Sequence, residues 1–476
     1  MKFNAVIIGS GPNGLAAGIR LAQQGWAVKI FERNETIGGG TRTKELTLPG
    51  FKHDVCSAIH PLAKASPFLK TLPLEKYGLE WIQPEVPVAH PLEDESCCAL
   101  FRSPEETTEQ LGQDGLTYWR TMDPFVRNWD KLIPQLLAPF NLLPDHPLLM
   151  ARFGLEGLHS ADTFTAKLRT CKARALFAGL AAHGILPFHK TATAAIGLVL
   201  GIAGHAVGWP FPKGGSQNLT KAMAEHFRSL GGKIETDTEI TSLQQLPAAD
   251  TIFFDITPKQ ILDLAEEKLP DSYTRKLTDF KYGSGVFKLD FALSDPIPWK
   301  DKICRKAGTI HLGNTYEEIA RAEAETARGK HPDKPFVLVS QHSLFDKSRT
   351  PEGKHTAWAY CHVPNSSTKD MTDPIINQIE RFAPGFRDCI LDKNAMNTVA
   401  MQEHNPNYIG GDINGGQQDI TQLFTRPAGL WDPYRILDTN MFICSSSTPP
   451  GGGVHGMCGY HAAESAIKNT HMPKWI

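Results

Sequence analysis

The sequence lacks the cysteine pattern of a secreted or zinc-binding protein. Its 476 residues contain nine cysteines, an odd number, and no two of them form a C-x-x-C pair. A disulfide framework and a zinc ribbon are therefore not expected, and no metal site is predicted. Such cysteine usage is typical of a reducing compartment. No basic segment with a cleavage site precedes the first strand-like run, so we expect a cytoplasmic protein without a leader.

Net charge is lacking as well. The chain has 49 basic and 51 acidic residues, which gives a formal charge of −2 at pH 7. This balance provides no electrostatic basis for binding nucleic acid or an anionic membrane. A peripheral membrane contact and assembly into a homo-oligomer stay open.

One stretch contains no charged side chain at all. Residues 191–212 have no Asp, Glu, Lys or Arg and are rich in Gly and Ala. A membrane span would need a denser run of Leu, Ile and Phe. The stretch therefore predicts a buried helix that lines an apolar cavity.

The N-terminal segment, residues 3–32, contains the most informative motif of the sequence. Residues 3–8 form a continuous apolar run typical of a buried parallel strand, and a G-x-G-x-x-G motif follows at 9–14. We expect a helix over 15–24 and a second strand over 27–31, which ends at Glu32. The acid follows the motif at close to the roughly 20 positions of a ribose-binding carboxylate. This combination predicts a dinucleotide-binding unit.

Each glycine of the motif has a separate task. Gly9 allows a tight turn, Gly11 lets the backbone approach a pyrophosphate, and Gly14 lets the helix pack on the strand. The positive end of the helix then faces the phosphates. Glu32 suits ribose hydroxyls and argues against the 2′-phosphate of NADP.

A second glycine cluster, at 38–40, distinguishes between NAD and FAD. At this point the sequence resembles the FAD-dependent desaturase and amine-oxidase superfamily, whose members have a Gly-Gly-Arg-x-x-Thr turn after the acid. Gly38, Gly39 and Thr43 match that turn, whereas Gly40 stands at the family's arginine position. Arg42 is the candidate to supply the missing charge.

Further stretches resemble the phytoene dehydrogenase-like proteins, in the branch of the pyridine nucleotide-disulfide oxidoreductase domain proteins. They are residues 50–61, 212–215, 282–290, 405–412 and 448–457, so the resemblance spans essentially the whole chain. It implies non-covalent FAD, with a C-terminal glycine loop around the isoalloxazine. The residues expected to contact FAD are Gly9, Gly11, Pro12, Asn13, Gly14, Glu32, Arg33, Gly38, Gly39, Gly40, Thr41, Arg42, Ile240, Gly452, Gly453, Val454, His455, Gly456 and Met457.

The resemblance also implies an α/β fold with two domains. A discontinuous Rossmann-like FAD-binding domain with a parallel sheet is expected over 1–75, 213–284 and 428–476. Residues 76–212 and 285–427 are expected to form a mixed α+β substrate domain. Runs at 286–293, 336–342 and 356–362 predict its antiparallel sheet, covered by a helix over 372–382. No second G-x-G-x-x-G follows a strand, so a separate NAD(P)H domain is not expected.

Few residues are candidates for chemistry, because flavin performs hydride transfer itself. His53, Asp54 and His60 lie on the segment that, by resemblance, runs beside the isoalloxazine. A histidine there serves either as a general base or as a hydrogen-bonded packing residue, and the sequence leaves both open.

Three functions are compatible with this sequence. The first is an FAD-dependent dehydrogenase or desaturase that takes hydride from a small apolar substrate, carotenoid- or lipid-like, and passes electrons to oxygen or a quinone. The second is an FAD-dependent amine oxidase. The third is a flavoprotein whose main role is redox-sensitive binding of a partner.

Overall fold

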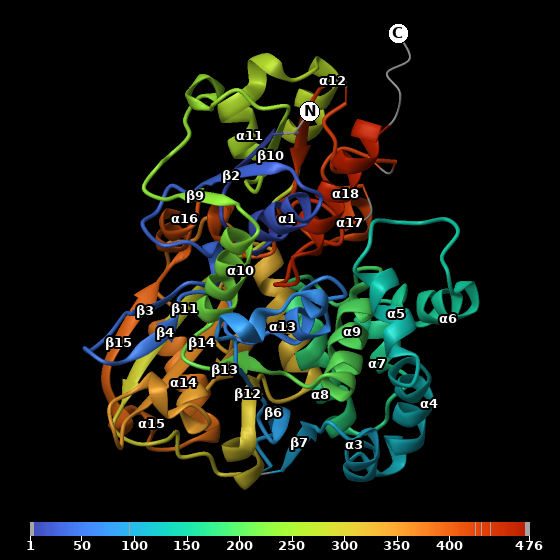
Figure 1. Cartoon of the computed structure of the whole chain (residues 1–476). Helices are drawn as coiled ribbons and strands as arrows, with labels where there is room; N and C mark the ends of the chain where they lie inside the picture. Colours follow the sequence, from blue (N-terminus) through green and yellow to red (C-terminus); the bar gives the residue numbers. More distant parts are fainter. Residues whose placement is uncertain (1–3, 95, 424, 430, 438, 472–476) are drawn as a thin grey trace.

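The computed structural model describes residues 4–94, 96–423, 425–429, 431–437 and 439–471. Its upper part in Figure 1 contains a parallel sheet of five strands in the order β16-β10-β1-β2-β9. Every pairing in this sheet is parallel; the central strands β1 and β10 are largely buried, whereas the edge strand β9 is partly exposed. The strands are β1 (Asn4–Ile8), β2 (Ala27–Phe31), β9 (Lys233–Glu235), β10 (Thr251–Phe254) and β16 (Met441–Ile443).

Three helices pack around this sheet: α1 (Pro12–Gln23), α10 (Gln217–Ser229) and α18 (Met457–His471). The helix α1 buries Leu15 and Ile19 completely, because its apolar residues recur at helical spacing. At the crossing of α1 and α18 the backbones nearly touch. A Cβ at Gly459 would lie 1.8 Å from the Asn13 carbonyl oxygen, so this position tolerates only glycine. The C-terminal helix is thereby held against the N-terminal one.

The lower part contains a sheet of seven strands in the order β15-β11-β14-β13-β12-β6-β7. The predicted antiparallel sheet is correct for five of its pairings but not for β6 and β12, which run parallel. The difference arises because β6 comes from a hairpin about two hundred residues earlier, and no local pattern reveals where such a strand docks. The strands are β6 (Val86–Pro91), β7 (Cys97–Leu100), β11 (Gly285–Leu293), β12 (Ala307–Leu312), β13 (Val337–Ser340), β14 (His355–Val363) and β15 (Ile390–Met396).

A block of helices lies beside the seven-stranded sheet, on the right in Figure 1. The uncharged stretch forms α9 (Thr193–Ala206), which packs on α8 (Cys171–Ala181). Among the described residues no helix combines the length and apolarity needed to cross a membrane. The block also contains α3 (Pro104–Gln110), α4 (Gly115–Val126), α5 (Trp129–Leu136), α6 (Pro147–Gly157) and α7 (Ala161–Thr165).

The remaining helices and four short strands complete the fold. They are α2 (Pro61–Ala65), α11 (Pro258–Ala265), α12 (Asp271–Thr278), α13 (Tyr316–Ala327), α14 (Thr372–Phe382), α15 (Phe386–Cys389), α16 (Thr398–His404), α17 (Ile420–Leu423), β3 (Thr43–Glu45), β4 (Lys52–Asp54), β5 (Trp81–Ile82) and β8 (Phe211–Pro212). All strands of the parallel sheet fall inside the segments predicted for the FAD-binding domain, and all strands of the other sheet fall inside those predicted for the substrate domain. The domain boundaries themselves stay a prediction.

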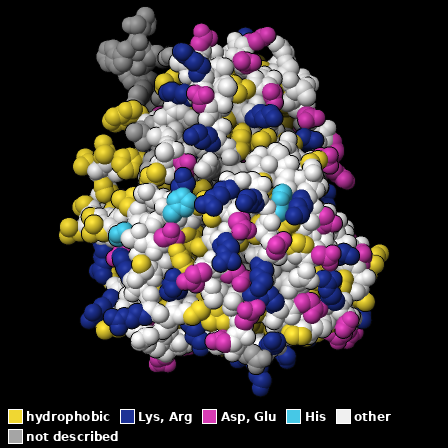
Figure 2. All heavy atoms as spheres, turned by 180° about the vertical axis from the view of Figure 1, so that it is seen from behind, with side chains coloured by type: hydrophobic (Ala, Val, Ile, Leu, Met, Phe, Trp, Pro, Cys, Tyr) yellow, Lys and Arg dark blue, Asp and Glu magenta, His cyan; other side chains and the backbone are white. Residues whose placement is uncertain are grey.

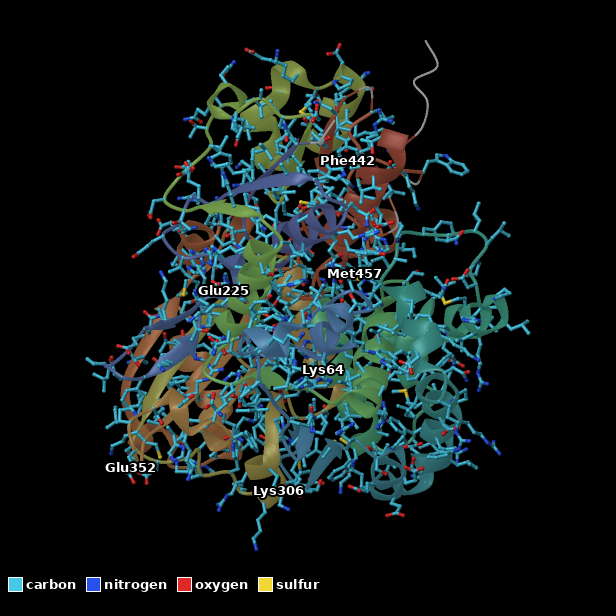
Figure 3. All side chains as sticks on the ribbon, viewed as in Figure 1. Lys64, Glu225, Lys306, Glu352, Phe442 and Met457 are labelled. Atoms are coloured by element: carbon cyan, nitrogen blue, oxygen red, sulfur yellow. The ribbon has the colours of Figure 1, made fainter. Side chains whose placement is uncertain are left out.

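Hydrophobic side chains are unevenly distributed over the surface. Seen from behind, charged groups of both signs are interspersed over most of the molecule, whereas hydrophobic side chains gather at the left edge (Figure 2). In the stick view Phe442 and Met457 lie in the upper part, and Lys306 and Glu352 lie at the lower rim (Figure 3). The space between the two sheets holds the cavity described next.

Candidate functional site

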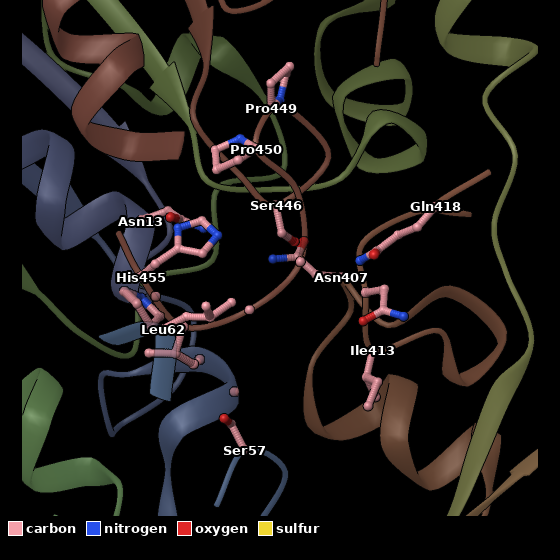
Figure 4. Close-up of a pocket in the computed structure, with 18 of the residues that line it drawn as sticks. Asn13, Ser57, Leu62, Asn407, Ile413, Gln418, Ser446, Pro449, Pro450 and His455 are labelled. Atoms are coloured by element: carbon pink, nitrogen blue, oxygen red, sulfur yellow. The ribbon is translucent and has the colours of Figure 1, made fainter. Parts of the chain in front are cut away.

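A large cavity of about 1800 Å³ connects the two parts of the molecule. At one end it is lined by the glycine motif and by 238–241, and at the other by α9 and the seven-stranded sheet. Between them the C-terminal loop arches through the close-up. Pro449 and Pro450 stand at its top, and Asn13 and His455 lie opposite Asn407 (Figure 4). The arrangement suits a long ligand with a polar and an apolar half.

An unpredicted acid, Asp255, lies behind the glycine motif. It follows β10 directly and accepts a hydrogen bond of 2.9 Å from the Gly14 backbone N–H. A Cβ on Gly11 would lie 2.7 Å from its Oδ2, so glycine is needed here on the protein side as well. Burial, together with the charge of Glu32, raises the pKa of Asp255 to about 8. The available signal was its position at the carboxyl end of a parallel strand, where ligand sites form.

Glu32 lies at the end of β2 and lines the cavity. One of its oxygens accepts hydrogen bonds from the backbone and hydroxyl of Ser10, the latter at 2.6 Å. The other oxygen accepts from the backbone and side chain of Asn34. These donors keep the carboxylate in place at the mouth of the glycine motif. Arg33 and Ile240 line the same end of the cavity.

The second glycine cluster touches the first. A Cβ on Gly39 would lie 3.2 Å from the Gly11 Cα, which shows how closely the two loops meet. Tyr408 explains why position 40 is a glycine and not the family's arginine, because a Cβ at position 40 would lie 2.1 Å from the tyrosine Oη. Arg42 donates to the backbone carbonyls of Gly39 and His404 at 3.0 and 2.7 Å. Arg42 lines the cavity, as do Gly40 and Thr41 but not Gly38.

The C-terminal loop is divided between the cavity and the helix α18. Gly452, Gly453, Val454 and His455 line the cavity, whereas Gly456 and Met457 lie outside its lining. His455 accepts a 3.0 Å hydrogen bond from the Met457 backbone through Nδ1, which fixes the first turn of α18. Burial lowers the pKa of His455 to about 4, so its ring is neutral at pH 7.

Only one of the three catalytic candidates reaches the cavity. His60 lines it, with Nε2 2.8 Å from the Ser216 hydroxyl. His53 is bonded to Thr47 at 2.7 Å, and Asp54 is paired with Arg349 at 3.0 Å. Both lie behind the cavity wall, outside its lining. Burial lowers the pKa of His60 to about 4.

The apolar half of the cavity is walled by α9, as the uncharged stretch predicts. Ala195, Ile196, Val199 and Leu200 line it and are only partly buried, because they face the hollow. Trp209, just beyond the helix, lines it too. Their neighbours Leu198 and Ile202 are fully buried on the opposite face. The prediction of an apolar wall is confirmed.

The facing wall is the seven-stranded sheet, and it contains a buried ion pair that sequence reasoning missed. Lys288 lines the cavity and is paired with Asp290 two residues further along β11. Trp358 and Tyr360 of the adjacent strand line it too, and their rings meet edge to face, with centroids 5.0 Å apart. Burial raises the pKa of Asp290 to about 6 against the opposing effect of the lysine. No local pattern marks this pair, because a lysine in a strand is ordinarily exposed.

Among the described residues no group of three or more His, Cys, Asp and Glu side chains could hold a metal ion. The described cysteines are all free, and burial raises the pKa of the Cys458 thiol, beside the C-terminal loop, to about 11.

Comparison with known proteins places these features in context. The NAD(P)-binding Rossmann-like domain family matches residues 7–72. Pyridine nucleotide-disulfide oxidoreductase domain-containing protein 2 of Mus musculus is 24% identical over 98% of this chain and 94% of its own. The zeta-carotene-forming phytoene desaturase of Myxococcus xanthus is 26% identical over 94% and 90%. The structure of cyclohexylamine oxidase from Brevibacterium oxydans matches with a TM-score of 0.60 at 14% identity, over 99% of this chain and all of that one. The chain is therefore a full-length homologue of pyridine nucleotide-disulfide oxidoreductase domain-containing protein 2 and of the phytoene desaturases.

Proposed function

We propose that this protein is an FAD-dependent oxidoreductase that takes hydride from an apolar substrate. The observation that carries the proposal is the continuity of the cavity, which joins the glycine motif and Glu32 to the apolar wall of α9. A dinucleotide lying along the first half would bring its reactive ring to the second half. The full-length homology to phytoene desaturases supports the same assignment.

The residues present fit FAD. Gly11 and Gly39 bring two backbone loops within contact distance where a pyrophosphate would pass. Asn13 lines the cavity beside this place. Glu32 and Ile240 would hold the adenosine half, and Gly452 to His455 the flavin half. The start of α18 would favour negative charge on the ring.

The protein's own contribution is to bind, orient and exclude water. Bound FAD would accept the hydride. The α9 wall and Trp209 would keep the apolar substrate against the ring and displace water from it. His60, neutral at pH 7, is the candidate to take a proton if one leaves with the hydride. Its bond to Ser216 holds the ring in one orientation.

The test begins with the purified protein, which should be yellow and release one FAD per chain on acid precipitation. Mass spectrometry of small molecules extracted from it should find an apolar compound. A colourless protein that binds NAD tightly would contradict the assignment. The variant His60→Ala should keep the colour and lower turnover by about 10²–10⁴-fold if the histidine is a general base. Unchanged turnover would make it a packing residue.

An amine oxidase is the second candidate, favoured by the fold match to cyclohexylamine oxidase and by the aromatic pair Trp358 and Tyr360. A protonated amine would, however, face Lys288 on the same wall. Reduction of the flavin by a series of amines and by apolar alkenes separates the two candidates. Reduction by neither class, with retained binding of a partner protein, would favour the third function.

A further inference from the structure

We infer that the end of the cavity formed by α9 and the seven-stranded sheet binds a hydroxyl or carbonyl oxygen of an otherwise apolar molecule, through Thr309 and His183. Both residues line the cavity. Thr309 belongs to β12 and His183 comes just after α8, and both elements lie in the lower half of Figure 1. The inference rests on the proposed function for the role of the bound molecule as substrate, and it adds a polar group to that substrate.

Thr309 has a hydroxyl group that the described part of the chain leaves unpaired. The residue is completely buried, and its Oγ1 has no hydrogen-bond partner among the described residues. The neighbouring hydroxyl across the strand pair, that of Ser340, donates instead to the Gly308 carbonyl at 3.0 Å. Leaving a buried hydroxyl unpaired costs free energy. Because Thr309 lines the cavity, a bound molecule can supply the missing partner.

His183 provides a second donor through its contact with another histidine. Its Nε2 lies 3.0 Å from Nε2 of His311. Burial lowers the pKa of both rings, that of His183 to about 3, so both are neutral at pH 7 and one Nε2 donates to the other. Nδ1 of His311 is buried and has no partner among the described residues, so a proton there would be left unpaired. The favoured tautomers therefore place the His311 proton on Nε2 and the His183 proton on Nδ1, where it can be donated to a ligand.

The packing of α8 on the sheet holds these groups in place. Thr309 and His311 are two residues apart on β12, so their side chains emerge on the same face of the sheet. On α8, a Cβ at Gly179 would lie 2.5 Å from His311 Nδ1, so the glycine makes room for the ring. The His183 ring also meets the Trp209 ring edge to face, with centroids 5.4 Å apart. Donors that are fixed before the ligand arrives lower the entropic cost of binding.

The surroundings favour a neutral oxygen over an anion. On the same sheet Lys288 is in register with His311 across four strands, roughly 14 Å away at about 4.8 Å for each strand spacing. This lysine is also paired with Asp290. A carboxylate at the two donors would therefore be buried without a counter-charge, which is costly, whereas a hydroxyl or carbonyl oxygen can accept both bonds. Leu338 and Trp209 line the same end, so the remainder of the molecule is expected to be apolar.

The test measures how tightly the purified full-length protein binds decane, 1-decanol and 2-decanone, by headspace gas chromatography over protein solutions. For each oxygenated probe, the affinity relative to decane removes the common apolar contribution. We expect this ratio to fall about tenfold in Thr309→Val, which keeps the shape of the side chain and removes the hydroxyl. His183→Phe should lower the ratio in the same direction. A fall with only one of the two probes would identify the oxygen as a hydroxyl or a carbonyl.

Two variants serve as controls. Thr309→Ser retains a hydroxyl and should keep the wild-type ratio. Ser340→Ala removes the neighbouring hydroxyl, which is bonded within the protein, and should keep the ratio while it lowers the unfolding temperature. Thr309→Val should unfold at the wild-type temperature or above, because no hydrogen bond to a described residue is lost.

A ratio unchanged by both Thr309→Val and His183→Phe would overturn the inference. So would a loss of stability in Thr309→Val as large as that in Ser340→Ala, because the Thr309 hydroxyl would then be bonded in the free protein. Failure of all three probes to bind would overturn this inference and the apolar substrate of the proposed function together. FAD content, measured by absorbance in each variant, tests the cofactor assignment separately.

Discussion

The two sheets place their buried polar groups differently. In the parallel sheet they stand at strand ends, where Glu32 follows β2 and Asp255 follows β10, and both are held by backbone or neighbouring donors. In the seven-stranded sheet Lys288 and Asp290 stand within β11 and are paired with each other. An acid at a strand end can accept bonds from loop backbone, whereas a charge in mid-strand must be compensated by other side chains, here chiefly Lys288 for Asp290. The first arrangement should therefore tolerate conservative change, and the second should not.

The largest effect is expected where the glycine motif meets Asp255. In Gly11→Val the new side chain would collide with the Asp255 carboxyl on one side and obstruct the pyrophosphate path on the other. We expect insoluble protein or protein without flavin, measured by the absorbance ratio of flavin to protein. Gly154→Ala on α6 is the control, because a Cβ there meets open space. Normal flavin content in Gly11→Val would remove the cofactor assignment of this loop.

The mid-strand pair should respond next most strongly. Lys288→Met or Asp290→Asn leaves one buried charge unpaired, which we expect to lower the free energy of unfolding by about 3–5 kcal/mol. The double variant Lys288→Met/Asp290→Leu should be more stable than either single variant. Denaturant unfolding measures all three. If the two single variants are as stable as the wild type, water or another group compensates the charge that each variant leaves behind.

Substitution of the strand-end acid Asp255 should change the stability much less than substitution of the mid-strand pair. Because burial raises the pKa of Asp255 to about 8, this carboxyl is largely protonated at pH 7, and Asp255→Asn resembles it closely. We expect a change of about 1 kcal/mol or less in the free energy of unfolding. A loss as large as that of Asp290→Asn would break the comparison between the two sheets.

The apolar wall offers a third contrast. Ile196→Asp points its charge into the cavity, whereas Leu198→Asp buries it in the core. We expect Ile196→Asp to keep a stable fold and lose the apolar substrate, and Leu198→Asp to destabilise the fold by several kcal/mol. Thermal unfolding and ligand extraction measure the two effects. If Ile196→Asp still retains the substrate, the substrate does not bind against α9.

The free energy of unfolding should fall gradually as the pH is lowered. Burial lowers the pKa of His53 and His404 to about 3 and those of His60 and His342 to about 4. Below about pH 6.5 the unfolded chain binds protons that the folded chain does not, so stability is present above that pH and lost as pH falls. The slope approaches about 1.4 kcal/mol per pH unit for each histidine. The raised pKa of Asp255 has the opposite effect, because its contribution to stability is lost as pH rises. Comparing the unfolding of Asp255→Asn with that of the wild type between pH 8 and pH 5 measures this contribution.

Several parts of the site could be predicted because their signals are local. A strand, a glycine turn, a helix and an acid within thirty residues specify the nucleotide end, and β2 begins and ends where expected. The strand β9 ends at Glu235, and Ile240, which was predicted to contact FAD, lines the cavity beyond it. The wall of α9 was predictable because twenty-two residues without charge have few other places in a folded protein.

The sequence by itself determined the dinucleotide-binding unit, the uncharged helix and the return of a glycine loop at the C-terminal end. Tertiary structure alone decided which distant residues complete them. Tyr408 occupies the space that Gly40 leaves, Asp255 lies under Gly11, and β6 joins β12 in parallel. The reason is physical: backbone conformation and hydrophobic period act over a few residues, whereas the partner of a buried polar group is selected by packing between segments hundreds of residues apart.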